Sequence, residues 1–148
     1  MNADSTLVTH WIDGRRHPGA TQRTGDVFDP ATGRVTARVA FASDGDVDAA
    51  VASAAAAATR WGDTSLAART AVLFSVRERL AASVDDLAAI VTSEHGKVLS
   101  DAAGEIKRGL EVVEYACGLA ALLQGAHTDN ASTDVDVHSL QQPLGVVG

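Results

Sequence analysis

The stretch SDAAGEIKRGLEVVEYACGLAALLQG, residues 100–125, decides the fold, because its apolar residues have the spacing of one long helix. Ser100 can cap its start and Gly125 can end it, which predicts a helix over 101–124. Two apolar stripes run along this helix. They comprise Ile106, Leu110, Val113, Cys117 and Ala120 in the first stripe, and Arg108, Val112, Tyr115, Leu119 and Leu122 in the second stripe. A helix with apolar residues on two sides is expected to be buried between two layers.

Arg108 is the one charged residue in the second stripe, and a buried guanidinium needs an anionic partner. From spacing alone we favour a structural interpretation, either a salt bridge or an alkyl stem packed on the protein with its charged end in water. The functional alternative is an anion site for the carboxylate of a substrate. Cys117 is interpreted as a small buried core residue, because a nucleophilic thiol needs accessible, electropositive surroundings.

Three more helices are expected before residue 100, each marked by a capping residue. A serine or threonine at a helix start accepts a hydrogen bond from a free backbone N–H group, and a glycine after the last turn ends a helix. The expected helices are about 46–61 after Ser43, about 66–82 after Thr64 or Ser65, and 84–95 after Ser83 with Gly96 as the stop.

Strands are expected towards both ends of the chain. Turn residues between short alternating stretches predict two hairpins. These hairpins are 10–12 with 15–17 around Asp13-Gly14, and 26–28 with 35–41 around the turn cluster 29–33. Residues 134–140 alternate between apolar and polar side chains, which predicts one more strand. Residues 1–9 are expected to be a loose terminus, and the whole pattern predicts an α/β fold.

Composition excludes several classes of function. The chain has 148 residues, the size of one domain, and a net charge of −7, which disfavours a nucleic-acid or anionic-membrane surface. No apolar run is long enough to cross a membrane, and the start has no features of a secretory signal. One cysteine cannot form an internal disulfide, and the five histidines lack metal-ligand spacing, so no metal site is expected. A cytoplasmic protein is expected.

Recognisable catalytic motifs are also absent from the sequence. It contains no GxSxG, HExxH or GxGxxG, so neither a nucleophile elbow nor a dinucleotide loop is expected. The last residues, 146–148, continue an apolar stretch, whereas chain ends are usually polar and solvated. We therefore expect the sequence to be a truncated part of a longer protein.

Four short motifs, in order and spacing, resemble the opening of the aldehyde dehydrogenase superfamily. They are WIDG at 11–14, DPATG at 29–33, EHGK at 94–97 and QPLGVVG at 142–148. Within the superfamily, DAAGE at 101–105 and RGLEVVE at 108–114 look like the CoA-acylating methylmalonate-semialdehyde dehydrogenase branch. The resemblance runs from about Trp11 to the end of the chain and covers roughly a third of what such an enzyme needs.

The resemblance implies an NAD-dependent oxidation in which a cysteine attacks the aldehyde and coenzyme A then takes the acyl group. Methylmalonate or malonate semialdehyde would lose CO2 and give propionyl-CoA or acetyl-CoA. No catalytic, cofactor or metal residue is carried over, and Cys117 does not match the catalytic cysteine of the family. The resemblance does assign Arg108 to the substrate carboxylate, in preference to the structural interpretation.

The resemblance also implies a domain organisation. Residues 10–125 would be the amino-terminal part of the NAD-binding domain, with two hairpins and four helices. Residues 126–148 would be the truncated start of an oligomerisation hairpin, and the strand near 134–140 would join a homo-oligomer, a dimer or tetramer. Two alternatives remain, a non-acylating NAD-dependent aldehyde dehydrogenase and a non-catalytic fragment that pairs with full-length subunits.

Overall fold

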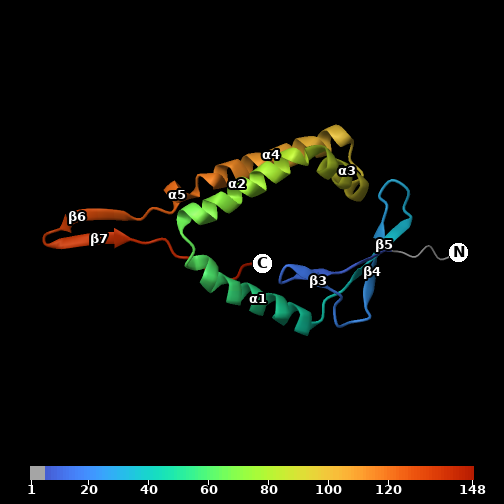
Figure 1. Ribbon diagram of the computed structural model, residues 1–148, viewed down its shortest axis with the longest axis horizontal. Helices are drawn as coiled ribbons and strands as arrows, with labels where there is room; N and C mark the ends of the chain where they lie inside the picture. The colour runs from blue at the N-terminus through green and yellow to red at the C-terminus, as the bar shows by residue number, and fades with distance from the viewer. Residues whose placement is uncertain (1–5) are drawn as a thin grey trace.

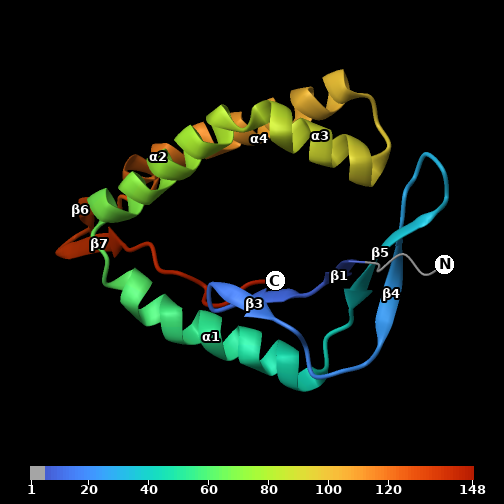
Figure 2. The same cartoon turned by 45° about the vertical axis from the view of Figure 1, so that its right-hand side comes forward.

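The computed structural model describes residues 6–148 and contains both helices and strands, as the sequence predicts. Figure 1 shows one helical layer of α2 (Leu66–Ala82), α3 (Val84–His95) and α4 (Leu99–Cys117), with α1 (Asp44–Gly62) apart from it. The hairpin of β6 (Ala126–Ser132) and β7 (Val135–Ser139) projects beyond α5 (Leu119–Leu122). Turned by 45°, the same elements form an open, curved arrangement in which the β2–β3 hairpin lies between α1 and the helical layer (Figure 2). The α/β fold class is confirmed.

The first predicted hairpin is present. Strand β2 (His10–Ile12) pairs antiparallel with β3 (Arg15–His17). Asp13 and Gly14 in the turn have φ angles of 54° and 71°, and two successive positive φ angles are typical of the tight turn that matches strand twist. The Asp-Gly pair therefore fixes this turn locally, as the sequence indicates.

The second predicted hairpin is also present, and a third strand extends it. Strand β4 (Thr24–Phe28) pairs antiparallel with β5 (Val35–Ala40), and Asp29 in the turn accepts hydrogen bonds of 2.8 Å from Ala31 N and from Thr32 Oγ1. Strand β1 (Thr6–Val8) pairs parallel with the other edge of β5.

The prediction of a loose terminus over 1–9 was therefore wrong for residues 6–8. The main chain of residues 6–8 pairs with residues 37–39 of β5. This partner lies about 30 positions away, so the sequence near the terminus does not indicate a strand. Residues 1–5 lie outside the described residues.

Helices α1 and α2 confirm the predicted serine caps, and α3 confirms the predicted stop at Gly96, whereas the side chain of Ser83 makes no capping hydrogen bond at the start of α3. Ser43 caps α1 (Asp44–Gly62), and Ser65 caps α2 (Leu66–Ala82), where Ser65 Oγ accepts from Ala68 N at 3.3 Å. Helix α3 (Val84–His95) follows Ser83 and ends at Gly96, which has a left-handed φ of 85° that glycine adopts without steric cost. These ends are set by local chemistry.

The longest helix differs from the prediction at both ends. Helix α4 (Leu99–Cys117) begins after Val98, so Ser100 lies inside the helix and does not cap it. Helix α4 ends before Gly118, and a separate helical turn, α5 (Leu119–Leu122), follows. Gly118 lacks the side chain that favours a continuous helix, and its N–H bonds to Tyr115 O, which tightens the last turn. The structure therefore has five helices within 6–148, where four were expected.

Only the first stripe of α4 is covered. Helix α4 packs against α2 and α3, and an ion pair of 2.7 Å joins Arg77 on α2 to Glu114 on α4. The buried positions at these contacts are small residues, among them Ala88, Ala102 and Cys117. The expectation that α4 is buried on two sides was wrong for this chain, because the second stripe has no layer against it among residues 6–148 and most of it is exposed.

The last hairpin contains one strand that the sequence does not predict. Strand β7 (Val135–Ser139) matches the prediction over 134–140, yet it is the second strand of a hairpin whose first strand is β6 (Ala126–Ser132). Strand β6 is polar and has no apolar alternation, so no pattern within residues 126–132 predicts a strand there. Pairing with β7 satisfies its backbone groups and makes it a strand.

The exposed surface is large for a chain of this size. The accessible surface is 11320 Å² for 15.2 kDa, whereas a compact monomer of this mass exposes about 7,100 Å². The excess includes many large apolar side chains, such as Trp11, Phe28, Val112 and Tyr115. Further protein surface is needed to cover these side chains.

Asp46 joins the start of α1 to the loop after β3, and we expect its charge to stabilise the fold. The side chain is 4% exposed, and its Oδ2 accepts from Ser43 N and Ser43 Oγ at 2.8 Å and from Ala20 N at 3.1 Å. The backbone N–H groups of Ser43 and then Ala20 lower the pKa of Asp46 from 3.8 to about 2. A carboxyl group with a lowered folded-state pKa stabilises the fold above its unfolded pKa and loses this effect as pH falls through the folded pKa.

Asp46→Asn is therefore expected to lower Tm at pH 7 by about 3–6 °C, because it removes a charged cap. The difference from the parent chain should shrink as pH falls from about 4 to about 2, where Asp46 itself becomes neutral. Thermal unfolding followed by circular dichroism at several pH values measures both effects. Asp48→Asn, at an exposed position of the same helix, is the matched control. A pH-independent difference between Asp46→Asn and the parent would contradict the charge argument.

Candidate functional site

Arg108, the predicted substrate-binding residue, lies in the middle of α4 on the uncovered stripe. The arginine is exposed, and the next residues along the same face, Val112 and Tyr115, are 68% and 70% exposed. A charged group at the edge of a broad apolar face becomes partly desolvated when that face is covered. Residues 6–148 do not themselves build a closed, dry pocket around Arg108.

Glu105, one of the two acidic residues three positions from Arg108 on α4, already has another partner. Lys97 Nζ donates a short hydrogen bond to Glu105 Oε1, one helical turn before Arg108. This bond is the main cause that lowers the pKa of Glu105, and Arg108 adds only a minor Coulombic effect. No salt bridge to Arg108 is found in the part of the chain that the structure describes. The guanidinium therefore keeps its five N–H donors for an anion from elsewhere.

Cys117 is a buried free thiol at the last residue of α4, as the sequence predicts. It belongs to the covered stripe and is 8% exposed. The interpretation as a small core residue is confirmed, and no catalytic role is given to it.

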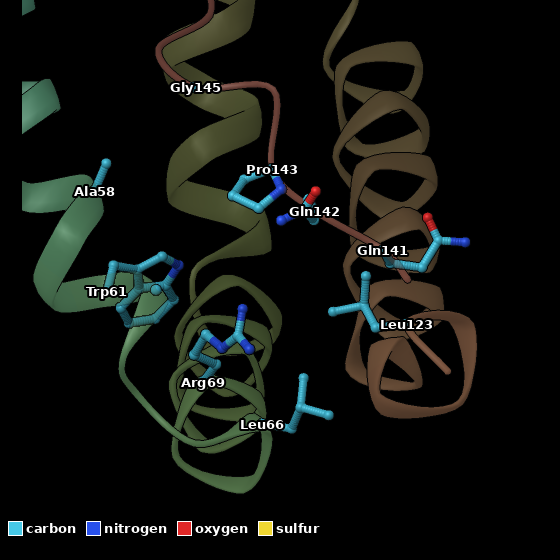
Figure 3. A pocket seen from close by; sticks show the side chains of 10 residues that line it. Ala58, Trp61, Leu66, Arg69, Leu123, Gln141, Gln142, Pro143 and Gly145 are labelled. Carbon is cyan, nitrogen blue, oxygen red and sulfur yellow. The ribbon is translucent and has the colours of Figure 1, made fainter. Parts of the chain in front are cut away.

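A pocket of about 480 Å³ opens between the end of α1, the start of α2, Leu123 directly after α5 and the residues after β7. Its lining is mostly apolar and contains one charged side chain, Arg69. Figure 3 shows Arg69 extending from α2 towards Pro143 and Gln142, with the ring of Trp61 beside it. The Nε atom of Arg69 is buried and has no hydrogen-bond partner, so this pocket can accept an anion or a carbonyl oxygen.

Sequence reasoning did not identify Arg69. An arginine on an amphipathic helix usually lies on its solvated face, and nothing near residue 69 marks it as different. The pocket forms because residues 141–145 fold back against the ends of α1, α2 and α5. This long-range contact leaves no local signal in the sequence.

Neither a metal-binding cluster nor a membrane-spanning helix occurs among residues 6–148. Residues 6–148 contain no group of three or more His, Cys, Asp or Glu side chains that could hold a metal ion. No helix in the described part is both long and apolar enough to span a membrane. The sheets within residues 6–148 are short, and no βαβ crossover joins their strands.

Comparison with known families and proteins gives a consistent result. The sequence model of the aldehyde dehydrogenase family matches residues 17–148. Malonate-semialdehyde dehydrogenase of Listeria monocytogenes serotype 4a is 36% identical over 146 residues, which are 99% of this chain and 30% of that protein. The human mitochondrial methylmalonate-semialdehyde/malonate-semialdehyde dehydrogenase [acylating] is 36% identical over 139 residues, 94% of this chain and 26% of that protein.

Solved structures agree. A structure described as a methylmalonate-semialdehyde dehydrogenase from Sinorhizobium meliloti 1021, complexed with NAD, superposes with a TM-score of 0.90 at 39% identity. The match covers 97% of this chain and 29% of that one. The methylmalonate-semialdehyde dehydrogenase of Oceanimonas doudoroffii gives a TM-score of 0.87 at 37% identity, covering 94% of this chain and 28% of that one. This chain therefore spans about 30% of the length of the relatives that it matches.

Proposed function

The chain belongs to the aldehyde dehydrogenase family, and from this membership we propose that it is part of an NAD-dependent, CoA-acylating dehydrogenase. The proposed substrates are methylmalonate and malonate semialdehyde, and the products are propionyl-CoA and acetyl-CoA with loss of CO2. The observation that carries this proposal is the exposed, unpaired Arg108 on α4 of a chain that is similar over nearly its whole length to semialdehyde dehydrogenases. A semialdehyde of this class has a carboxylate, and a guanidinium binds a carboxylate in a two-pronged geometry.

In this proposal the present chain recognises the substrate and does not perform the chemical step. The thiol, the hydride transfer and the coenzyme A site need residues that 6–148 do not provide. No residue of the chain is assigned to NAD, because its described part has neither a dinucleotide loop nor the crossover that would hold one. When bound, NAD would supply the hydride acceptor.

The domain assignment is part of the same proposal. Residues 10–125 would belong to an NAD-binding domain and residues 126–148 would begin the oligomerisation element of a homo-oligomer. The edge strand of this oligomerisation element would be β7, which is short and exposed. Among residues 6–148, no strand other than β6 pairs with it. Exposed edges of this kind pair with strands of other chains.

The acylating chemistry is tested by expressing the complete reading frame that contains this chain. With malonate semialdehyde and NAD, the enzyme should form acetyl-CoA only when coenzyme A is added, and mass spectrometry of the thioester detects the product. Formation of the free acid without coenzyme A, at the same rate, would favour a non-acylating aldehyde dehydrogenase. A stop codon directly after residue 148 would instead favour a non-catalytic module that pairs with full-length subunits.

The 148-residue chain alone is expected to have no dehydrogenase activity. Its one cysteine is buried in the α4 contact, and its described residues provide no dinucleotide loop. Absorbance of NADH, recorded with the chain, malonate semialdehyde, NAD and coenzyme A, should not rise above that of a heat-denatured sample. NADH formation that follows the concentration of the folded chain would show that its own residues suffice.

A further inference from the structure

The β6–β7 hairpin carries two histidines that face each other across its strands. His127 on β6 pairs in register with His138 on β7, and their rings stack with centroids 4.4 Å apart and planes 15° apart. Side chains directly opposite each other on antiparallel strands lie on the same face of the sheet. The backbone register therefore holds the two imidazoles side by side.

A carboxylate lies on the same face of the hairpin. Asp136 is two residues before His138, and alternate residues of a strand share a face. Its Oδ1 accepts from Asn130 N at 2.9 Å, which fixes the side chain, and its Oδ2 lies 4.0 Å from His127 Nε2. This separation is too long for a hydrogen bond, so the carboxylate places a negative charge beside the imidazole without occupying its nitrogen.

The face is open to solvent. The side chains of His127 and Asp136 are 52% and 50% exposed, and His138 is exposed as well. Figure 1 shows the hairpin extending beyond α5, away from the helical layer. The valines of β7, Val135 and Val137, alternate with these polar residues and stand on the other face. An ion could reach the histidines without any rearrangement of the fold.

We propose that His127 and His138 form a binding site for one divalent transition-metal cation of the copper, nickel or zinc class. Neutral imidazole nitrogens bind such ions at about 2.0–2.1 Å, so two nitrogens that share an ion lie about 3–3.5 Å apart. In the stacked arrangement the two ring planes are nearly parallel, so their nitrogen lone pairs do not converge on one point. Binding therefore requires the two exposed side chains to turn about their χ angles until one nitrogen of each ring faces the ion, while the backbone register stays as it is. Asp136 adds favourable charge, and water fills the other positions, since no third protein ligand is arranged for an ion among residues 6–148.

The proposed metal site is independent of the proposed enzymatic function. An edge strand pairs with another chain through its backbone groups, whereas the histidine rings stand on the face of the hairpin. The spacing of eleven positions between the histidines resembles no short metal motif, which is why the sequence predicts no metal. The observed register between β6 and β7 brings the two residues together.

Isothermal titration of the purified 148-residue chain with CuCl2, NiCl2, ZnCl2 or MgCl2 tests the proposal. One equivalent of Cu²⁺, Ni²⁺ or Zn²⁺ should bind, with Cu²⁺ binding most tightly and Mg²⁺, which prefers oxygen ligands, not binding. His127→Asn or His138→Asn should weaken binding by roughly 100-fold, because each removes one of two linked ligands.

His95→Asn, at an exposed position near the end of α3, is the matched control and should leave binding unchanged. Far-UV circular dichroism of each variant checks that the fold is retained. Absence of Cu²⁺, Ni²⁺ and Zn²⁺ binding to the parent chain would overturn the proposal. Unchanged binding in both His127→Asn and His138→Asn would also overturn the proposal, because other groups would then hold the ion.

Discussion

Replacing Arg108 with leucine in the complete enzyme is expected to lower kcat/KM sharply for methylmalonate semialdehyde and much less for propionaldehyde. The two aldehydes differ in the carboxylate that Arg108 is proposed to bind. The lost contact should cost about 2–5 kcal/mol of transition-state binding, which corresponds to roughly 30- to 5,000-fold in kcat/KM. The predicted loss is large because a guanidinium and a carboxylate form two charge-assisted hydrogen bonds in a site from which water is excluded.

Steady-state kinetics with both aldehydes on one soluble variant measures this difference. Lys107→Leu is the matched control, because Lys107 is the neighbouring exposed cation on α4 and has no proposed contact with the substrate. It should change both kcat/KM values by less than about threefold. Equal losses for the two aldehydes in Arg108→Leu, together with a lower Tm, would show that Arg108 has a structural role and does not bind the carboxylate.

The parts of the fold that local chemistry determines could be predicted from the sequence. Ser43, Ser65 and Gly96 set helix ends with bonds or backbone angles that involve only nearby residues. The Asp13-Gly14 turn likewise needs only two positive φ angles. Such signals are readable in one sequence because their partners lie within a few positions.

The parts that depend on distant residues could not be predicted. Strand β1 exists because β5 has a free edge, and β6 exists because β7 pairs with it. The periodicity of α4 continues through Gly118, so only the observed backbone shows that the helix is interrupted there.

The candidate site was predicted only in part. Arg108 was singled out by its place in an apolar stripe and by the resemblance, and its role in binding a substrate stays a prediction. The apolar stripe correctly marks an apolar face, but it cannot show what covers that face. Arg69 was missed because its pocket forms only when residues 141–145 lie against the helices. The histidine pair was missed because only the register between β6 and β7 places His127 beside His138.

The uncovered face of α4 has an energetic consequence for the isolated chain. Val112 and Tyr115 each leave more than two thirds of their surface in water, and Leu122 continues the same face. Covering a large apolar side chain contributes about 1.5–3 kcal/mol, so two copies of the chain gain free energy by placing such faces together. The exposed edge of β7 adds backbone groups that can pair with a second copy.

The 148-residue chain alone is therefore expected to self-associate at micromolar concentration. The double variant Val112→Lys/Tyr115→Lys should weaken this association by at least about tenfold for each side chain, because lysine at these positions keeps its charge in water. Size-exclusion chromatography with multi-angle light scattering measures the mass of the particles. Glu111→Lys changes the net charge by the same two units without removing an apolar side chain, so it separates the effect of charge from that of the apolar face. A parent chain that elutes as a clean monomer at these concentrations would contradict the prediction, since its exposed apolar surface would then be stable in water without a partner.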